Sequence, residues 1–156
     1  MQLKVEVEVQ APKQAVWAVI TDIEGSASRI SSIQKLEILE KPAGSLVGLK
    51  WRETRVMFGQ EATEVMWVTA AVDNDHYDVR AESHGAIYTT TMAVKGEGAS
   101  STLSMAFGAE VLTFGAKVMW ALTGWIAVRA MRKALLKDLS ELRDAAEAAH
   151  RSAAAA

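Results

Sequence analysis

The chain of 156 residues has no cysteine, only two prolines and only three histidines. The absence of cysteine excludes disulfides, thiolate metal sites and cysteine nucleophiles together, and it fits the cytoplasmic location that we expect. No pair among His76, His84 and His150 has metal-ligand spacing together with a carboxylate on a helix. We therefore expect no metal and no other cofactor.

Neither sign of charge dominates, because 17 lysines and arginines stand against 19 aspartates and glutamates, for a net charge of -2. This balance predicts no nucleic-acid partner and no global attraction to an anionic membrane. Long hydrophobic runs are also missing. The longest charge-free stretch of the last third, 118–128, is shorter than the ~20 residues that cross a bilayer, so we expect no stable membrane insertion. The alternation from Lys4 to Val9 is not that of a signal peptide.

What is present is the composition of a folded protein, with 50% hydrophobic and 23% charged residues. No internal repeat and no linker divides the chain. We therefore expect a single domain over 1–150, large enough to bury a core, and a disordered tail over 151–156.

Hydrophobic periodicity of two predicts strands over 3–9, about 33–38, 47–58, 60–72, 76–83, 88–94 and 103–107. Helical spacing predicts a helix over 13–21, a short helix or turn over 22–29, and a long helix over about 115–149. Short turns between strands imply an antiparallel sheet, and the long helix must cover its inner face. The predicted fold class is α+β: a curved antiparallel sheet of about seven strands around a C-terminal helix, with a ligand space between the layers.

The strand predicted at 47–58 carries charge on its apolar face. One face holds Leu49, Trp51, Glu53, Arg55 and Met57, and the other holds Lys50, Arg52 and Thr54. Buried charge is costly unless it is paired or used, so Glu53 and Arg55 are the leading candidates for a functional pair. Arg55 is suited to gripping a ligand carboxylate or enolate, and Glu53 to orienting it or moving a proton. The alternatives are a structural ion pair, or a bulge that turns both outward.

The register of the next strand, 60–72, is open. One register turns Glu61, Thr63, Val65 and Trp67 inward, and the other turns Gln60, Ala62, Glu64, Met66 and Val68 inward. We favour the first, because tryptophan is the larger apolar group. Glu61 would then lie near Arg55 across the hairpin and join the candidate catalytic residues.

Three segments of the chain carry a family resemblance. They are Val7 to Pro12 leading into Ala15-Val16-Trp17 and Thr21-Asp22, then Val47 to Trp51 with a glycine turn after it, and the final helix with Asp138-Leu139 and Glu141-Leu142. In this order they resemble the START-like (SRPBCC) superfamily, the helix-grip fold of polyketide cyclases, lipid-transfer proteins and the birch pollen allergen. The resemblance covers nearly the whole chain and implies a hydrophobic cavity between sheet and final helix. It does not imply one function.

We expect a small hydrophobic ligand, such as a lipid, polyketide or aromatic metabolite. A cyclase, aromatase or dehydratase that uses the cavity glutamates and Arg55 is the second hypothesis, and an interaction module with a packed interior is the third. Large apolar and methionine side chains would line the cavity beside Glu53 and Arg55. The expected ligand-binding residues are Trp51, Glu53, Arg55, Val65, Trp67, Tyr77, Tyr88, Met92, Met105, Phe107, Met119 and Leu122.

The segment 118–128 is apolar nearly all round, which indicates a helix that is covered on more than one side. It can roof the cavity, form a homodimer interface, or meet a membrane when cargo is exchanged. We favour the roof. Trp120 and Trp125 do not both fit into one small core, so we expect one of them to be exposed.

Overall fold

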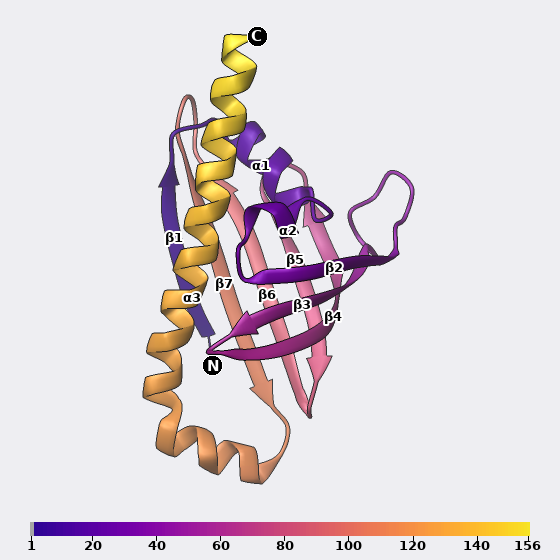
Figure 1. The fold of residues 1–156 in the computed structure, drawn as a ribbon, viewed down its shortest axis with the longest axis vertical. Helices are drawn as coiled ribbons and strands as arrows, with labels where there is room; N and C mark the ends of the chain where they lie inside the picture. Colours follow the sequence, from indigo (N-terminus) through magenta and orange to yellow (C-terminus); the bar gives the residue numbers. More distant parts are fainter. Residues whose placement is uncertain (1) are drawn as a thin grey trace.

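The computed structural model describes residues 2–156, without the side chains of Ala116, Met119, Trp120, Leu122 and Thr123. Seven strands and three helices make up this part of the chain (Figure 1). In order they are β1 (Gln2–Val9), α1 (Lys13–Thr21), α2 (Ser26–Arg29), β2 (Ile33–Glu40), β3 (Lys50–Met57), β4 (Gln60–Val72), β5 (His76–Ser83), β6 (Ala86–Lys95), β7 (Ser101–Val111) and α3 (Phe114–Ala155).

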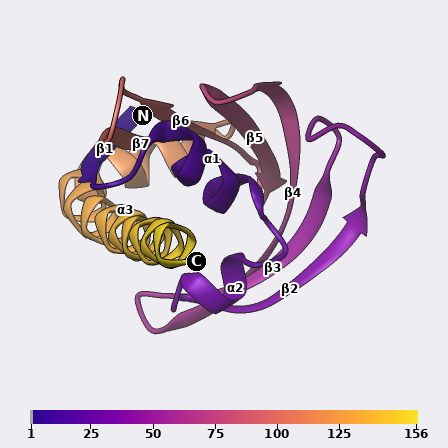
Figure 2. The same cartoon turned by 90° about the horizontal axis from the view of Figure 1, so that it is seen from above.

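The strands form one antiparallel sheet in the order β1-β7-β6-β5-β4-β3-β2. From β2 to β7, strands that are consecutive in the chain pair with each other. β1 pairs with β7, so that Gln2 lies opposite Gly108. Seen from above, the sheet curves around a hollow side, and α3 lies on that side close to β1 and β7 (Figure 2). The predicted fold class, a seven-stranded sheet around a long final helix, is confirmed.

Local sequence explains β1, the start of α1 and two of the hairpin turns. In β1 the valines and Leu3 point inward and the charged residues point outward, as alternation requires. Pro12 caps α1, because its fixed φ suits the start of a helix. Two-residue turns join β3 to β4 and β5 to β6, and both residues of each turn have positive φ, with glycine second in each (Gly59 and Gly85).

The core lies between the inner face of the sheet and the second half of α3. Leu135, Leu139, Leu142 and Ala146 recur at helical spacing and are buried against the strands and α1. The largest fully buried side chains are Leu103, Leu139, Val5, Val9, Val16, Val68 and Val94. Most of them come from β1, β6, β7 and α3, so the molecule is packed most tightly on the β1 side.

Two boundaries differ from the sequence predictions. β3 begins at Lys50 rather than at 47, because a turn precedes it in which the Leu49 amide donates to the Leu46 carbonyl. The expected disordered tail at 151–156 is instead helical up to Ala155. The run of alanines there has the highest helix propensity of any residue type, so the helix continues without tertiary contacts.

Candidate functional site

The turn at Phe58-Gly59 decides which side chains of β4 face inward. Because it contains two residues, Met57 pairs with Gln60, and Arg55 pairs with Ala62. Paired residues on neighbouring antiparallel strands share a face. The preferred register was therefore wrong. The inner residues are Gln60, Ala62, Glu64, Met66 and Val68, and the outer ones are Glu61, Thr63, Val65 and Trp67.

This register moves three predicted site residues away from the inner face. Glu61 lies opposite Val56 and is exposed, so it is not the partner of Arg55. Val65 and Trp67 lie on the outer face, where Trp67 pairs with Lys50 and Arg80. Glu64 takes the inner position instead, opposite Glu53.

Arg55 is the centre of a buried ion cluster that joins β3 to α3. Its Nε donates to Glu53 Oε1, and its Nη1 donates to Asp138 Oδ2 at 2.5 Å and to Ser32 Oγ at 3.3 Å. Ser32 Oγ also bonds Asp138 Oδ1 at 3.1 Å, and Trp51 Nε1 donates to Glu53 Oε2 at 3.2 Å. We call Glu53, Arg55 and Asp138 the ion cluster.

The ion cluster is shielded from water to different degrees. The side chains of Glu53 and Asp138 are 5% and 6% exposed, whereas that of Arg55 is 22% exposed. Burial alone would lower the pKa of Arg55, but the charges of Glu53 and Asp138 and their hydrogen bonds outweigh it and raise that pKa. Arg55 therefore stays charged at any pH at which the protein is folded. Two carboxylates around one guanidinium leave the cluster with an excess of negative charge.

One nitrogen of Arg55 remains available. Among the described residues, none accepts a hydrogen bond from Nη2. No buried side-chain nitrogen or oxygen in the described part lacks a partner, so Nη2 belongs to the exposed part of the side chain. It is a donor that a guest could use without breaking the cluster.

Asp138 was missed as a site residue, although a signal for it was present. Met131, Leu135, Asp138 and Leu142 are spaced by four, three and four residues, which places the carboxylate on the apolar, sheet-facing stripe of the helix. A lone charge on such a stripe needs a partner of opposite sign, and the sequence offered Arg55.

Tyr77 belongs to the same region of the inner face. Its hydroxyl donates to the Ile20 carbonyl at 2.8 Å, and its ring meets Trp17 edge to face at 6.0 Å. Burial, and then the negative charge of Glu53, raise the pKa of Tyr77, so its hydroxyl stays protonated. Tyr77 thus acts as a fixed neutral donor between β5 and α1.

The apolar side chains of β6 and β7 become more accessible toward one end of the sheet. On β6, Val94 is 1% and Met92 is 4% exposed, whereas Thr90 and Tyr88 are half-buried. On β7, burial likewise falls from Leu103 to Phe107, which stacks on Tyr88 at 6.0 Å. The accessible end is the one with the turns at Phe58-Gly59 and His84-Gly85, where Arg55 also lies.

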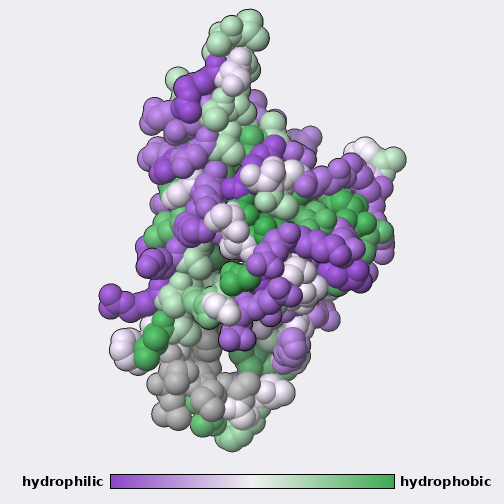
Figure 3. All heavy atoms as spheres, in the orientation of Figure 1, coloured by the Kyte–Doolittle hydropathy of each residue, from purple (hydrophilic) through white to green (hydrophobic). Residues whose placement is uncertain are grey.

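Apolar residues also reach the surface near this end, at the foot of the molecule in Figure 3. Of the predicted ligand-binding residues, Trp51, Glu53, Arg55, Tyr77, Tyr88, Met92, Met105 and Phe107 share the inner face. The predicted contacts of Met119 and Leu122 lie outside the described side chains.

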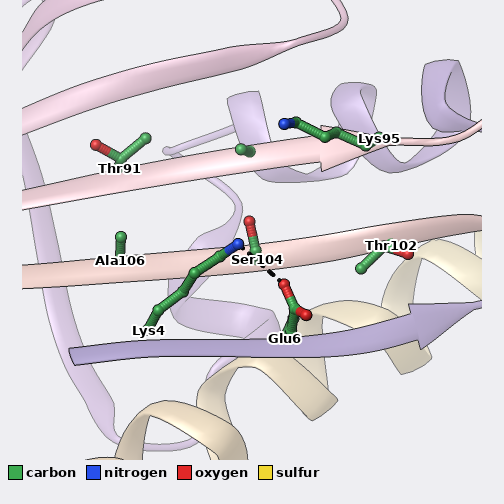
Figure 4. Close-up of a pocket in the computed structure, with 8 residues that line it drawn as sticks. Lys4, Glu6, Thr91, Lys95, Thr102, Ser104 and Ala106 are labelled. Atoms are coloured by element: carbon green, nitrogen blue, oxygen red, sulfur yellow. Dashed lines mark ion pairs between the residues drawn. The ribbon is translucent and has the colours of Figure 1, made fainter.

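Two hollows lie elsewhere on the surface of the described part. One, of about 370 Å³, is on the outer face of β1, β7 and β6, where Lys4 and Glu6 form an ion pair among small polar residues (Figure 4). The other, of about 360 Å³, lies between α1 and the loop that precedes β3, with Trp17, Leu46 and Leu49 in its wall. Its position beside Trp17 and Leu49 places it next to the inner face at Tyr77 and Trp51.

Within residues 2–156 as described, no group of three or more histidine, aspartate or glutamate side chains is arranged to hold a metal ion. Of the helices in that part, none is both long enough and apolar enough to cross a membrane.

Solved structures share this fold at low sequence identity. A protein from Thermus thermophilus matches with a TM-score of 0.80 and 16% identity, over 96% of this chain and 99% of its own. The Zhui aromatase/cyclase from Streptomyces sp. R1128 matches with a TM-score of 0.69 and 17% identity, over 94% and 93% of the two chains. A START superfamily protein from Mycobacterium smegmatis matches with a TM-score of 0.62 and 14% identity, over 87% of this chain and 97% of its own.

The sequence itself identifies the family, although no curated protein sequence matches the chain. The family model described as polyketide cyclase / dehydrase and lipid transport matches residues 1–147, which include every strand and all but the last turns of α3. Fold and family together support a role in binding a hydrophobic ligand or in cyclase-type chemistry. With its helix-grip sheet, its long closing helix and this match, the chain belongs to the polyketide cyclase / dehydrase and lipid transport family.

Proposed function

We propose that this protein binds one small apolar molecule on the inner face of the sheet, with a hydrogen-bond acceptor of that molecule at Arg55 Nη2. The observation that carries the proposal is the incomplete burial of the stacked Tyr88 and Phe107 at the same end of the sheet as Arg55. Stacked aromatic rings left accessible on a concave face offer a guest area and shape, and a single cationic donor fixes its orientation.

The sheet limits the size of the guest. β3 and β6 are separated by β4 and β5, so they lie three strand spacings apart, about 14 Å along a flat sheet and less across a curved one. A molecule of two or three fused rings, or an acyl chain of similar length, spans that distance. We expect its acceptor to be a neutral carbonyl or hydroxyl oxygen. The two carboxylates of the ion cluster would repel a guest anion, whereas Nη2 can still donate a hydrogen bond to a neutral oxygen.

Binding can be tested with paired variants at adjacent positions of β6. Thr90 lies on the inner face opposite Phe107, and Thr89 lies on the outer face opposite Gly108. Thr90→Phe should fill the site and weaken binding of the probe 1-anilinonaphthalene-8-sulfonate, measured by fluorescence titration, about tenfold or more. Thr89→Phe adds the same ring to the outer face and should leave the affinity unchanged. Equal affinities of the two variants would refute the inner-face site.

The contribution of Arg55 to binding can be tested with a second pair of variants. Arg55→Lys keeps a positive charge near Glu53 and Asp138 but removes the second nitrogen of the fork. It should weaken binding of the neutral ketone probe 6-propionyl-2-(dimethylamino)naphthalene, measured by fluorescence titration, whereas Arg52→Lys on the outer face should not. Native mass spectrometry of freshly purified protein, before and after organic extraction, would show whether a molecule of the expected size is retained.

Cyclase-type catalysis is the second candidate, and Glu64 is the observation in its favour. Both carboxylate oxygens of Glu53 already accept hydrogen bonds, from Arg55 and Trp51. Glu64 lies beside it on the inner face, and no ion pair engages it among the described residues. If the protein is an enzyme, Glu64→Gln should lower turnover of a polyketide-type substrate without weakening its binding.

A further inference from the structure

The first half of α3 presents an apolar stripe to solvent. Phe114, Val118, Ala121 and Trp125 are spaced by four, three and four residues, so they lie on one side of the helix. All four are exposed, with 83% of Phe114, 47% of Val118 and 68% of Trp125 accessible. Leu112 and Ile126 beside the stripe are also exposed, at 56% each. This is the opposite of an amphipathic helix that packs its apolar side on a core.

The charges around the stripe have one sign. Between Leu112 and Lys137 the sequence contains basic residues and no acidic residue. Lys117 lies one residue before Val118, and Arg129 and Lys133 follow Trp125 at intervals of four on the same side. Within the described part of the chain, no carboxylate forms an ion pair with any of these three. The cations therefore remain available to an external anionic partner.

We propose that this stripe and its flanking cations dock the protein on an anionic lipid surface, with the first half of α3 lying in the plane of the interface. Aromatic and aliphatic side chains on one side of a helix and lysine or arginine beside them are the features of an interfacial helix. Trp125 is a residue type that settles at the boundary between headgroups and acyl chains, and Phe114 supplies apolar area that is buried beside it. The positive charge supplies attraction to anionic headgroups, which the net charge of the whole chain does not.

A second copy of the chain fits this surface less well. A symmetric dimer would bring the same stripe and the same cations of two copies together. Lys117, Arg129 and Lys133 would then face their own equivalents across a water-poor interface without a carboxylate from the same segment, which is repulsive. The proposal is independent of the proposed function, because neither Arg55 nor the inner face takes part in it.

Vesicle sedimentation tests the proposal on the full chain. We expect binding to vesicles of phosphatidylcholine with one quarter phosphatidylglycerol, little binding to pure phosphatidylcholine, and a decrease as sodium chloride rises from about 50 to about 300 mM. Lys117→Glu/Arg129→Glu should reduce the partition coefficient about 25-fold or more, and Phe114→Ser/Trp125→Ser about tenfold or more. Lys35→Glu and Val72→Ser, at an exposed cation and an exposed apolar residue elsewhere, are the matched controls.

The outcomes separate the possible occupants of the stripe. Equal binding to neutral and anionic vesicles, or no effect of salt on the wild-type protein, would overturn the proposal without reference to any variant. It would also be overturned if the wild-type protein were a dimer in light scattering and Phe114→Ser/Trp125→Ser a monomer, with no vesicle binding by either. Circular dichroism of each variant checks that loss of binding is not loss of fold.

Discussion

Replacing Arg55 by methionine should cost this protein a large part of its stability. Methionine fills much of the volume but leaves Glu53 and Asp138, 5% and 6% exposed, with no cation between them. Removing one partner of a buried ion pair costs about 3–5 kcal/mol, because the remaining charge is desolvated and uncompensated. Here two carboxylates remain, so we expect the upper part of that range.

The size of the effect makes the test decisive. The free energy of unfolding of such domains is about 5–15 kcal/mol. At this chain length, a loss of 1 kcal/mol from it lowers Tm by roughly 2–4 °C. Arg55→Met should therefore lower Tm by about 10 °C or more, and urea denaturation should show a lower midpoint. Since the pKa of Arg55 is raised, the stabilisation by its positive charge in the wild-type protein does not change between pH 5 and 9, and it would be lost only at strongly alkaline pH.

Arg52→Met is the control for this experiment. Arg52 lies three residues earlier on β3, on the outer face, with its side chain 45% exposed and paired with Glu37 at 3.5 Å. Exposed pairs contribute less than about 1 kcal/mol, so its loss should be small. Glu53→Gln/Arg55→Met/Asp138→Asn, which removes all three charges, should recover much of the loss. A cost below about 1 kcal/mol for Arg55→Met would refute the argument that a desolvated ion cluster holds α3 to β3.

Two further predictions concern residues around the cluster. Tyr77→Phe leaves the buried Ile20 carbonyl without its hydrogen bond and should cost about 1–3 kcal/mol in urea denaturation, whereas Tyr88→Phe, whose hydroxyl has no partner among the described residues, should cost almost nothing. Burial would raise the pKa of Glu141, but hydrogen bonds from Ser31 and Lys137 and the charge of Lys137 outweigh it and lower that pKa from its ordinary value of 4.5. Glu141 therefore stabilises the fold above pH 4.5 and loses this effect as the pH falls through its lower folded pKa, so the stability difference between wild type and Glu141→Gln should shrink from pH 4.5 to pH 3. A difference that stays constant from pH 7 to pH 3 would contradict this assignment.

The fold could be predicted from local patterns, because apolar residues repeat at every second position in the strands and at every third or fourth position in the helices. The alternation of β1 and the glycine turns of the hairpins are visible in sequence, and consecutive pairing then follows from short connections. The tail was mispredicted because alanine-rich ends were judged by position rather than by helix propensity.

The register of β4 against β3 is set by the number of residues in the turn between them, not by the hydrophobicity of the side chains. Trp67 was expected on the inner face because it is large. The two-residue turn at Phe58-Gly59 instead pairs Met57 with Gln60, and this pairing determines which side chains of β4 face inward. It places Trp67 on the outer face. Turn length is a covalent constraint and overrides the preference of a single side chain. Had it been applied, Glu64 rather than Glu61 would have been placed beside Glu53.

The pairing of Arg55 with Asp138 could not be read from sequence. The two residues are 83 positions apart, and their meeting depends on how far α3 lies across the sheet. The exposed stripe of α3 is a second such case. A charge-free segment is compatible with a roof, a dimer contact or a membrane contact, and the sequence does not show that Trp125 and Phe114 are accessible to solvent.

The pairing of β1 with β7 also bears on how the chain is made. β1 is the first strand of the sheet to be synthesised, whereas the strand that covers its edge, Ser101–Val111, is the last. At about 5–20 residues per second, roughly 5–20 s pass before this partner exists. Throughout that interval β1 has no strand to pair with, so its inward side chains Leu3, Val5, Val7 and Val9 stay exposed and prone to aggregation until β7 is made.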